Sequence, residues 1–405
     1  MVPPDLSIGP GISQDSSGAA AFYRQRLLEG IVPFWLQHGI DRTHGGLLTC
    51  MDDTGRRQST DKYLWSQGRG VWTFAALYRR VDPRPEFLDI ARSTADFILH
   101  HGRDNNGDVV YRVGQAGGII EGYTSVYSNL FAAYGLNELA QASGEARYHK
   151  FALDFLQRSF EELRQPFFGR IAPYRIPAGI AWVHGPPMIC LEVANEIAAA
   201  TGSPLAEEAV EWCLGRILHA HIRREPLTLL EHLTESDDFL DTPEGRIIVP
   251  GHAIESMWFV IHAALRLGKA EPVHLALQVI RRMLEAGWDE CSGGLSLGLD
   301  YRKGGTPALA NAEKKIWWVH TEALYALVLA SRLTEEPWCR EWYKRVSQWS
   351  FDHFENGTGE WIRGVDRDGK PITETVALPV KDPFHFPRAL ILIYQTLQRG
   401  RPLYG

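Results

Sequence analysis

Hydrophobic residues recur with a helical period of about 3.6 over some twelve stretches of the chain. No stretch alternates apolar and polar residues for long enough to predict a strand. The sequence therefore predicts a mostly helical protein. The expected helices span residues 17–38, 61–81, 85–101, 123–143, 145–164, 184–201, 205–222, 251–267, 271–286, 313–333, 336–354 and 384–398.

The connections between these helices alternate between short and long. Links of a few residues at 82–84, 202–204 and 334–335 indicate antiparallel helical hairpins. Between hairpins lie loops of roughly 20 to 30 residues, and several carry an Asp or Asn turn followed by glycine. These turns, at 41–46, 104–107, 289–294 and 355–359, recur about every 60 to 66 residues or a multiple of that, a period typical of repeated supersecondary units.

Six such units account for the whole chain. A helical hairpin cannot bury its apolar face alone, so six hairpins most simply close into an all-α (α/α)6 barrel with inner and outer helices. We expect one catalytic domain over residues 1–405, with residues 1–16 as a flexible N-terminal extension. The long loops are expected to form small β-hairpins at the mouth of a site. An open solenoid would need polar capping repeats at its ends, and the sequence has none.

Composition and charge narrow the functional classes. The net charge of -7 and the lack of a long basic run argue against binding to nucleic acid or an anionic membrane. No segment reaches the roughly 18 apolar residues of a membrane span, and the N-terminus lacks a signal-peptide pattern, so we expect a cytoplasmic protein. The five cysteines are scattered without a CxxC spacing, which indicates neither a disulfide framework nor a thiolate zinc site; we expect no metal.

Polar and aromatic residues cluster in the first turns of the helices that follow long loops. In a closed ring these six helix starts lie at one end, so the clusters are predicted to line one substrate cavity. The clusters are Lys62, Tyr63, Trp65, Gln67 and Arg69; Tyr123, Tyr127 and Asn129; His184 and Met188; His252 and Glu255; Lys315, Trp317, Trp318, His320 and Glu322; and His385 and Arg388.

Two histidines stand out because each begins a helix. The positive end of the helix dipole biases an imidazole toward its neutral, basic form. His252 and Glu255 share a helical face, which would let the carboxylate orient the ring; a capping histidine and a surface glutamate are the alternative. With His385 the chain has two such groups, and epimerisation needs an acid or base on each side of a planar intermediate.

Arg69 is either a structural ion-pair partner or the group that holds an oxyanion.

The aromatic pair Trp317 and Trp318 suggests a division of roles. We expect one ring to pack in the core and its neighbour to lie nearer the substrate, since aromatic rings stack on sugar faces. His184, beside Gly185, either lines the pocket or caps its helix, and the sequence favours neither.

Taken together, these residues resemble the N-acylglucosamine 2-epimerase family over nearly the whole chain. The resemblance rests on six ordered segments: residues 34–35 with 44–46, 61–69, 250–258, 287–289, 315–323 and 384–388. It implies an (α/α)6 barrel and reversible proton transfer at C2 of a ring-opened sugar. His252 and His385 then resemble the paired acid and base, Arg69 the arginine that binds substrate oxygens, and Glu255 the assisting carboxylate.

The resemblance leaves the substrate open. N-acetylglucosamine/N-acetylmannosamine or glucose/mannose epimerisation is the main hypothesis, and mannose/fructose isomerisation or cellobiose 2-epimerisation share the scaffold. The resemblance implies a homodimer and a reaction without a required cofactor. Some members use ATP as an activator that they do not consume; the chain has no G-x-x-x-x-G-K-[ST] loop, so ATP binding stays open.

Two other functional classes fit an α-helical barrel. A glycoside hydrolase would need a carboxylate pair, and Asp61, Glu255 and Glu322 offer no clear one. A protein-binding module would bind a partner without moving any sugar proton.

Overall fold

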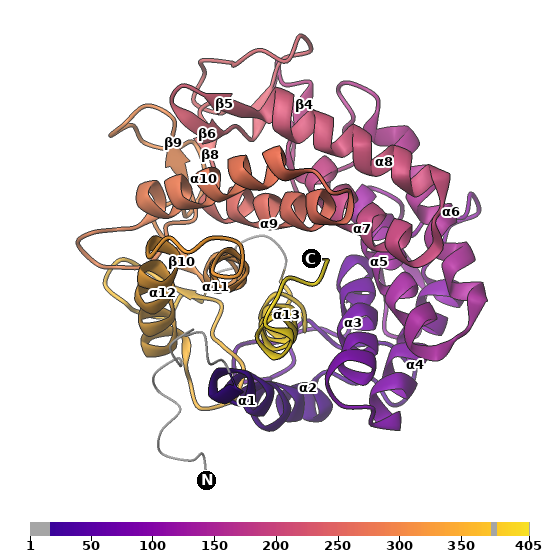
Figure 1. Cartoon of the computed structure of the whole chain (residues 1–405). Coiled ribbons are helices and arrows are strands. Elements are labelled where there is room, and N and C mark those ends of the chain that lie inside the picture. Colours follow the sequence, from indigo (N-terminus) through magenta and orange to yellow (C-terminus); the bar gives the residue numbers. More distant parts are fainter. Residues whose placement is uncertain (1–16, 374–378, 405) are drawn as a thin grey trace.

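Six helices form a closed inner ring in the computed structural model, which describes residues 17–373 and 379–404 (Figure 1). Each inner helix contacts the next around the ring, and the last contacts the first. The extension expected at residues 1–16 lies outside the described residues. The inner helices are α3 (Leu64–Ala76), α5 (Val126–Ser143), α7 (Gly185–Thr201), α9 (Pro250–Arg266), α11 (Trp317–Ala330) and α13 (His385–Arg399).

The remaining helices form an outer layer around this ring. Most hairpins pair an inner helix with the outer helix that follows it in the chain, as the short links predict. The outer segments are α1 (Ser17–Gln25) continued by η1 (Arg26–Ile31) and α2 (Val32–His38), α4 (Pro85–His101), α6 (Ala146–Leu163), α8 (Pro204–Gly215) continued by η3 (Arg216–His221), α10 (Ala270–Gly287) and α12 (Trp338–Phe354). The π-helical turn η2 (Leu77–Val81) extends α3.

The sixth hairpin joins the two ends of the chain. Inner helix α13 packs against α1, so the last helix pairs with the first. This pairing closes the (α/α)6 barrel and confirms the predicted fold class over the open solenoid. The predicted helix at 313–333 is too long at both ends, because residues 315–316 form a strand and residues 331–333 form a turn.

The two layers differ in how much of each helix is buried. In α11, every residue from Val319 to Ala330 is buried, because neighbours surround an inner helix on all sides. In α6 and α10 only one face is buried, with the polar residues on the other face. No helix within the described part of the chain is long and apolar enough to cross a membrane.

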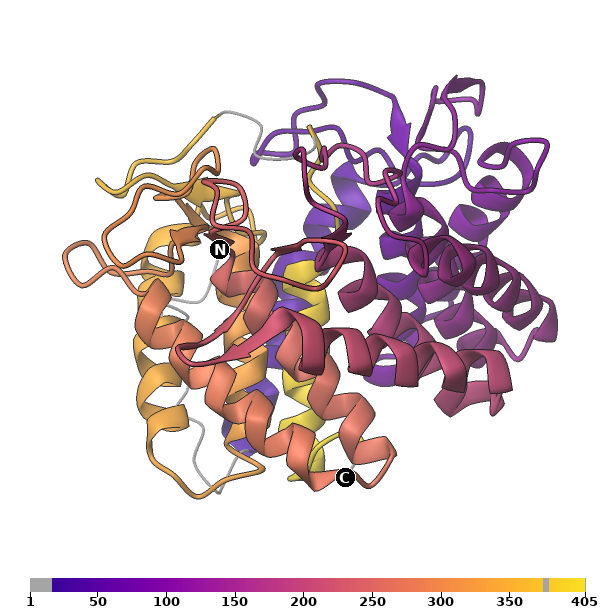
Figure 2. The same ribbon diagram turned by 90° about the horizontal axis from the view of Figure 1, so that it is seen from above.

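The long loops gather at one end of the barrel, where the inner helices begin (Figure 2). They carry short antiparallel strand pairs, and the predicted small hairpins form only at β2–β3 and β5–β6 among the described residues, because the other pairs join loops of successive repeats. Strands β1, β4, β8 and β10 each lead almost directly into an inner helix. The strands are β1 (Lys62–Tyr63), β2 (Arg112–Val113) and β3 (Ile119–Glu121) in one sheet, and the pairs β4 (Trp182–Val183) with β7 (His232–Leu233), β5 (Ile222–Arg224) with β6 (Leu227–Leu229), β8 (Ile247–Ile248) with β9 (Leu299–Asp300), and β10 (Lys315–Ile316) with β11 (Gly364–Val365).

The turns predicted at residues 41–46 and 289–294 have the same structure. Asp41 accepts the backbone N–H groups of residues 43 and 44, and Asp289 accepts those of residues 291 and 292. Each turn ends in two glycines with positive φ, a conformation that side chains disfavour. A buried lysine then holds each aspartate: Lys62 lies 2.9 Å from Asp41, and Lys315 lies 3.2 Å from Asp289. These lysines are therefore structural equivalents in two repeats.

The fourth residue of an inner helix completes this unit. In α3, Gln67 accepts the Leu47 N–H at 2.7 Å, and in α11 the His320 Nε2 accepts the Leu295 N–H at 2.9 Å. In α5, Asn129 accepts the Val109 N–H at 2.7 Å. The polar side chain at this position satisfies a buried backbone donor of the preceding loop, which would otherwise stay unpaired.

Candidate active site

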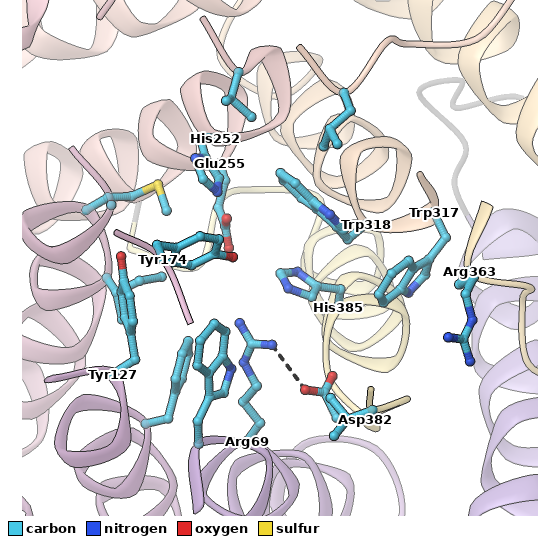
Figure 3. Close-up of a pocket in the computed structure, with 18 of the residues that line it drawn as sticks. Arg69, Tyr127, Tyr174, His252, Glu255, Trp317, Trp318, Arg363, Asp382 and His385 are labelled. Carbon is cyan, nitrogen blue, oxygen red and sulfur yellow. Dashed lines mark hydrogen bonds and ion pairs between the residues drawn. The ribbon is translucent and has the colours of Figure 1, made fainter. Parts of the chain in front are cut away.

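A cavity of about 300 Å³ opens at the mouth of the barrel, among the starts of the inner helices (Figure 3). All four residues predicted to be catalytic line it: Arg69, His252, Glu255 and His385. The described lining residues are Trp65, Arg69, Tyr127, Phe131, Tyr174, Gly185, Met188, Ile189, Val249, His252, Glu255, Leu297, Leu309, Ala310, Trp317, Trp318, Arg363, Val380, Asp382 and His385.

His252, in the first turn of α9, is paired with a carboxylate. Its Nδ1 lies 3.3 Å from both oxygens of Glu231, which follows strand β6. Burial by itself lowers the pKa of His252, but the charge and hydrogen bond of Glu231 more than offset burial and raise this pKa above its usual value. His252 is thus biased toward the imidazolium form, with Nε2 left for the cavity.

The carboxylate partner of His252 differs from the one that the sequence suggested. Glu255 shares the helical face and its charge helps to raise the pKa of His252, but its described hydrogen bond is accepted from Arg388 and not from the ring. The spacing predicted which face both side chains occupy, whereas the contact was decided by Glu231, 21 residues away in the chain. Glu255 still lines the cavity, almost fully buried.

His385, the first residue of α13, has the opposite bias. Its Nδ1 lies 2.7 Å from Glu322 of α11, so Nδ1–H donates to the carboxylate and Nε2 is left as the basic nitrogen on the cavity side. Glu322 alone would favour the charged ring, but its same oxygen also accepts from Arg388. Burial, helped by the guanidinium of Arg69, holds the pKa of His385 well below its usual value.

The two imidazoles therefore face one cavity with pKa values shifted in opposite directions, upward for His252 and downward for His385. The prediction that a helix start keeps the ring neutral holds for His385 and is wrong for His252, because the Glu231 carboxylate outweighs burial and the helix dipole. Trp318 contacts both rings, with centroid distances of 5.2 Å to His252 and 5.7 Å to His385. One indole thus contacts both the imidazole with the raised pKa and the imidazole with the lowered pKa.

Arg69 is held on the cavity wall by a carboxylate and three rings. Its Nη1 donates to Asp382 at 3.1 Å. Its guanidinium lies 4.7, 4.2 and 4.8 Å from the ring centroids of Trp65, Phe131 and Phe384. Cation–π contacts and the ion pair fix the orientation of the group, so Arg69 is both a structural ion-pair partner and a cation exposed to the cavity.

Arg388 lies one layer beneath the cavity. It donates to Glu255 and, at 2.8 Å, to Glu322. Glu255, Glu322 and His385 place ligand atoms close enough for a metal ion, but the guanidinium already supplies the positive charge between the two carboxylates. Arg388 thus orients Glu322, which in turn orients His385.

The aromatic lining agrees only in part with the sequence analysis. Trp65, Tyr127 and Met188 line the cavity as predicted. The expected division between Trp317 and Trp318 is wrong, because both rings line the cavity and both are only partly buried. Neighbouring residues in the first turn of α11 point to different parts of the same opening (Figure 3).

Eight predicted substrate contacts are not among the described lining residues of the cavity, and six of these are parts of the scaffold. Lys315, Asn129 and His320 belong to the repeated turn units described above. Each of the other three is used elsewhere: Tyr63 packs against Tyr111, Tyr123 donates to Glu162, and the His184 Nε2 contacts Ser256. Glu322 and Arg388 act from beneath the cavity. A polar residue at a helix start either hydrogen-bonds within the scaffold or lines the cavity. The local sequence looks the same in both cases.

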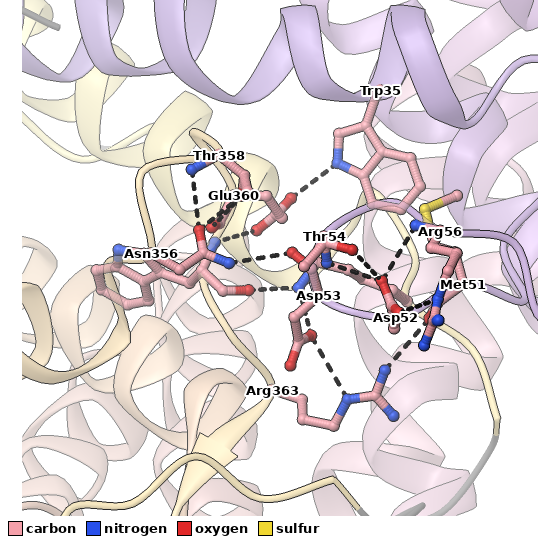
Figure 4. Close-up of polar contacts among 12 residues, drawn as sticks. Trp35, Met51, Asp52, Asp53, Thr54, Arg56, Asn356, Thr358, Glu360 and Arg363 are labelled. Carbon is pink, nitrogen blue, oxygen red and sulfur yellow. Dashed lines mark hydrogen bonds and ion pairs between the residues drawn. The ribbon is translucent and has the colours of Figure 1, made fainter.

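Several cavity residues carry no local signal. Tyr174 lies in a long loop, and Asp382 lies three residues before the start of α13, outside its N-cap position at Phe384. Glu231 also lies in a loop and holds His252, although it is not among the described lining residues. Arg363 lines the cavity while its guanidinium contacts Asp53 and the backbone oxygen of Met51, which ties the first long loop to the last (Figure 4). Closure of the helical ring brings these residues together, and short sequence motifs do not predict it.

The chain is similar to known proteins over most of its length. The family model described as N-acylglucosamine 2-epimerase matches residues 35–389. An N-acylglucosamine 2-epimerase of Bos taurus is 29% identical over 92% of this chain and 90% of its own. A cellobiose 2-epimerase of Bacteroides fragilis is 23% identical over 85% and 91%. The solved structure of a sugar epimerase from a ruminal bacterium superposes with a TM-score of 0.82 at 20% identity, covering 95% of this chain and 100% of that one.

Proposed function

The chain belongs to the N-acylglucosamine 2-epimerase family and is a carbohydrate isomerase, and from this premise we propose that His385 and His252 exchange the C2 proton of its sugar. The observation that carries the proposal is the placement of two imidazoles with opposite pKa shifts on one cavity, with Trp318 in contact with both. Inversion at C2 requires that arrangement: one group removes a proton from one face, and another returns a proton to the opposite face.

The protonation states suggest the order of events. In the open-chain sugar, neutral His385 takes the C2 proton through Nε2, and the C2 electron pair forms the C1–C2 double bond of an enolate, which is an enediolate where C2 bears a hydroxyl group. The negative charge moves to the C1 oxygen, beside which the Arg69 guanidinium is proposed to lie. Protonated His252 then donates to C2 from the other face. The reverse reaction starts from the resulting states, with neutral His252 as the base and protonated His385 as the acid, and proton exchange with solvent resets both rings for another forward turnover.

The chemistry needs only groups of the chain. A proton leaves and returns, and no electron is transferred, so the proposed reaction requires no cofactor. If the proton returns to C1 instead of C2, the product is a ketose, which is the isomerase alternative. N-acetylglucosamine/N-acetylmannosamine interconversion is the proposed reaction, since the bovine relative bears that family's name.

An NMR screen in deuterated water tests the proposal. The five sugars are N-acetylglucosamine, N-acetylmannosamine, glucose, mannose and cellobiose, each incubated with the enzyme. We expect deuterium at C2 of at least one sugar together with its C2 epimer. A ketose product would identify an isomerase, and free glucose from cellobiose would identify a hydrolase. Absence of label from C2 of all five would contradict the proposal.

A further inference from the structure

Opening of the sugar ring is a separate step that the two histidines leave unassigned. An aldose in its pyranose form has no C1 carbonyl, and the C2 proton becomes acidic only after the ring opens. Ring opening moves one proton from O1 to O5, both of which are bonded to C1. A single acid/base group beside C1 can therefore carry out the whole transfer.

We infer that Asp382 is the group that opens and closes the pyranose ring. Asp382 lines the cavity and is nearly buried, with 7% of its surface exposed. Both of its described hydrogen bonds fall on one oxygen: Oδ2 accepts from Arg69 at 3.1 Å and from the Ser66 hydroxyl at 3.2 Å. The other oxygen, Oδ1, is left for a ligand (Figure 3).

The position of Arg69 selects Asp382 over the other carboxylates. This step rests on the proposed function, in which Arg69 holds the C1 oxygen. The carboxylate hydrogen-bonded to Arg69 is then the one beside O1 and O5. Glu255 also lines the cavity, but its partner is Arg388, and Glu231 is engaged by His252. Asp382 and His385, three residues apart in the chain, both line the cavity, as the acid/base groups that serve C1 and C2 of one substrate must.

The proton balance closes on Asp382 alone. The O1–H bond breaks and its proton passes to Oδ1, while an O1 electron pair forms the C1=O1 carbonyl. The C1–O5 bond breaks, and its electron pair goes to O5. The protonated Asp382 then gives the same proton to O5, which restores the carboxylate. Ring closure after epimerisation is the reverse sequence, and Arg69 stabilises the charge on the oxygen in both directions.

Anomer exchange measures this step separately from C2 chemistry. Freshly dissolved α-anomers of glucose and N-acetylglucosamine are followed by NMR as the β-anomer appears, with the enzyme-free rate subtracted. We expect the wild-type enzyme to accelerate this exchange and Asp382→Asn to slow the enzymatic rate by roughly 100-fold or more. His385→Ala should lose C2 exchange and keep anomer exchange. Asp289→Asn removes a carboxylate from a scaffold ion pair and should keep both.

The outcomes separate this inference from the proposed function. Wild-type anomer exchange by Asp382→Asn would overturn the role of Asp382, and so would its loss in Glu255→Gln alone. If Asp382→Asn does not fold, anomer exchange by His385→Ala still tests the inference. Loss of anomer exchange in His385→Ala would assign ring opening to the histidine. C2 labelling by a wild-type enzyme that does not accelerate anomer exchange would leave ring opening to solvent and overturn the inference. Absence of both activities would contradict the proposed function itself.

Discussion

His320 and His385 both lie in the first turn of an inner helix, are both buried and both have a lowered pKa, yet their surroundings give them different work. The His320 Nδ1 contacts the Ile316 oxygen at 2.9 Å and its Nε2 accepts the Leu295 N–H, so both ring nitrogens are used by the backbone. Burial lowers the pKa of His320 to about 3. The His385 Nδ1 is fixed by Glu322, and its Nε2 remains on the cavity side. A buried, neutral imidazole becomes chemically useful only when one nitrogen is left unused by the scaffold.

The largest expected effect is a loss of C2 proton exchange when a histidine on the cavity wall is replaced. His385→Ala and His252→Ala should each lower C2 proton exchange by about two to four orders of magnitude, because each removes a positioned acid or base. The thermal midpoint should change little. Exchange rates by NMR and melting curves check this pair of variants, and near-normal exchange in either one would refute the assigned role.

Substitutions in the scaffold ion pairs should lower the free energy of unfolding and leave the C2 exchange rate nearly unchanged. Lys62→Met leaves Asp41 buried without its cation and should cost about 3 to 5 kcal/mol of the free energy of unfolding. The repeat equivalent Lys315→Met should behave alike. Denaturant unfolding measures both, and the folded fraction should retain C2 exchange within a few-fold. If Lys315→Met lost C2 exchange without losing stability, Lys315 would be a substrate contact and not a scaffold residue.

A smaller loss of stability is expected for the scaffold histidine itself. His320→Ala leaves the buried Leu295 N–H without an acceptor, which should cost about 1 to 3 kcal/mol. The rate of C2 exchange per folded molecule should stay near that of the wild type. Its contrast with His385→Ala isolates the role of the unused nitrogen. Equal losses of exchange in the two variants would erase the distinction.

The smallest effect is a shift in the pH profile. For the direction in which His385 takes the proton, exchange should fall at low pH as His385 becomes protonated, and fall at high pH as His252 loses its proton. Glu231 raises the pKa of His252, so Glu231→Gln should move the alkaline limb to lower pH by about one unit. The acidic limb should stay in place. Profiles of kcat/KM against pH for the two proteins measure this, and an unmoved alkaline limb would exclude His252 as the acid.

Much of this architecture was accessible from the sequence, because helical period and turn residues are local properties. The predicted helices fall within a few residues of those observed, apart from the overlong one at 313–333. The prediction that six helix starts share one cavity placed Arg69, His252, Glu255 and His385 correctly on its wall. The same reasoning assigned Lys315, Asn129 and His320 to the substrate, since a polar residue at a helix start looks alike whether it faces the cavity or a backbone turn.

The sequence by itself determined the repeat, the helices and the end of the barrel at which polar residues collect. Tertiary structure decided which of those residues face the cavity and which carboxylate each one contacts. Asp382 reaches Arg69 across 313 residues, and α13 reaches α1 across nearly the whole chain. Such contacts form only when the ring closes, and burial together with the charged neighbours in that closed ring then shifts the pKa of each imidazole.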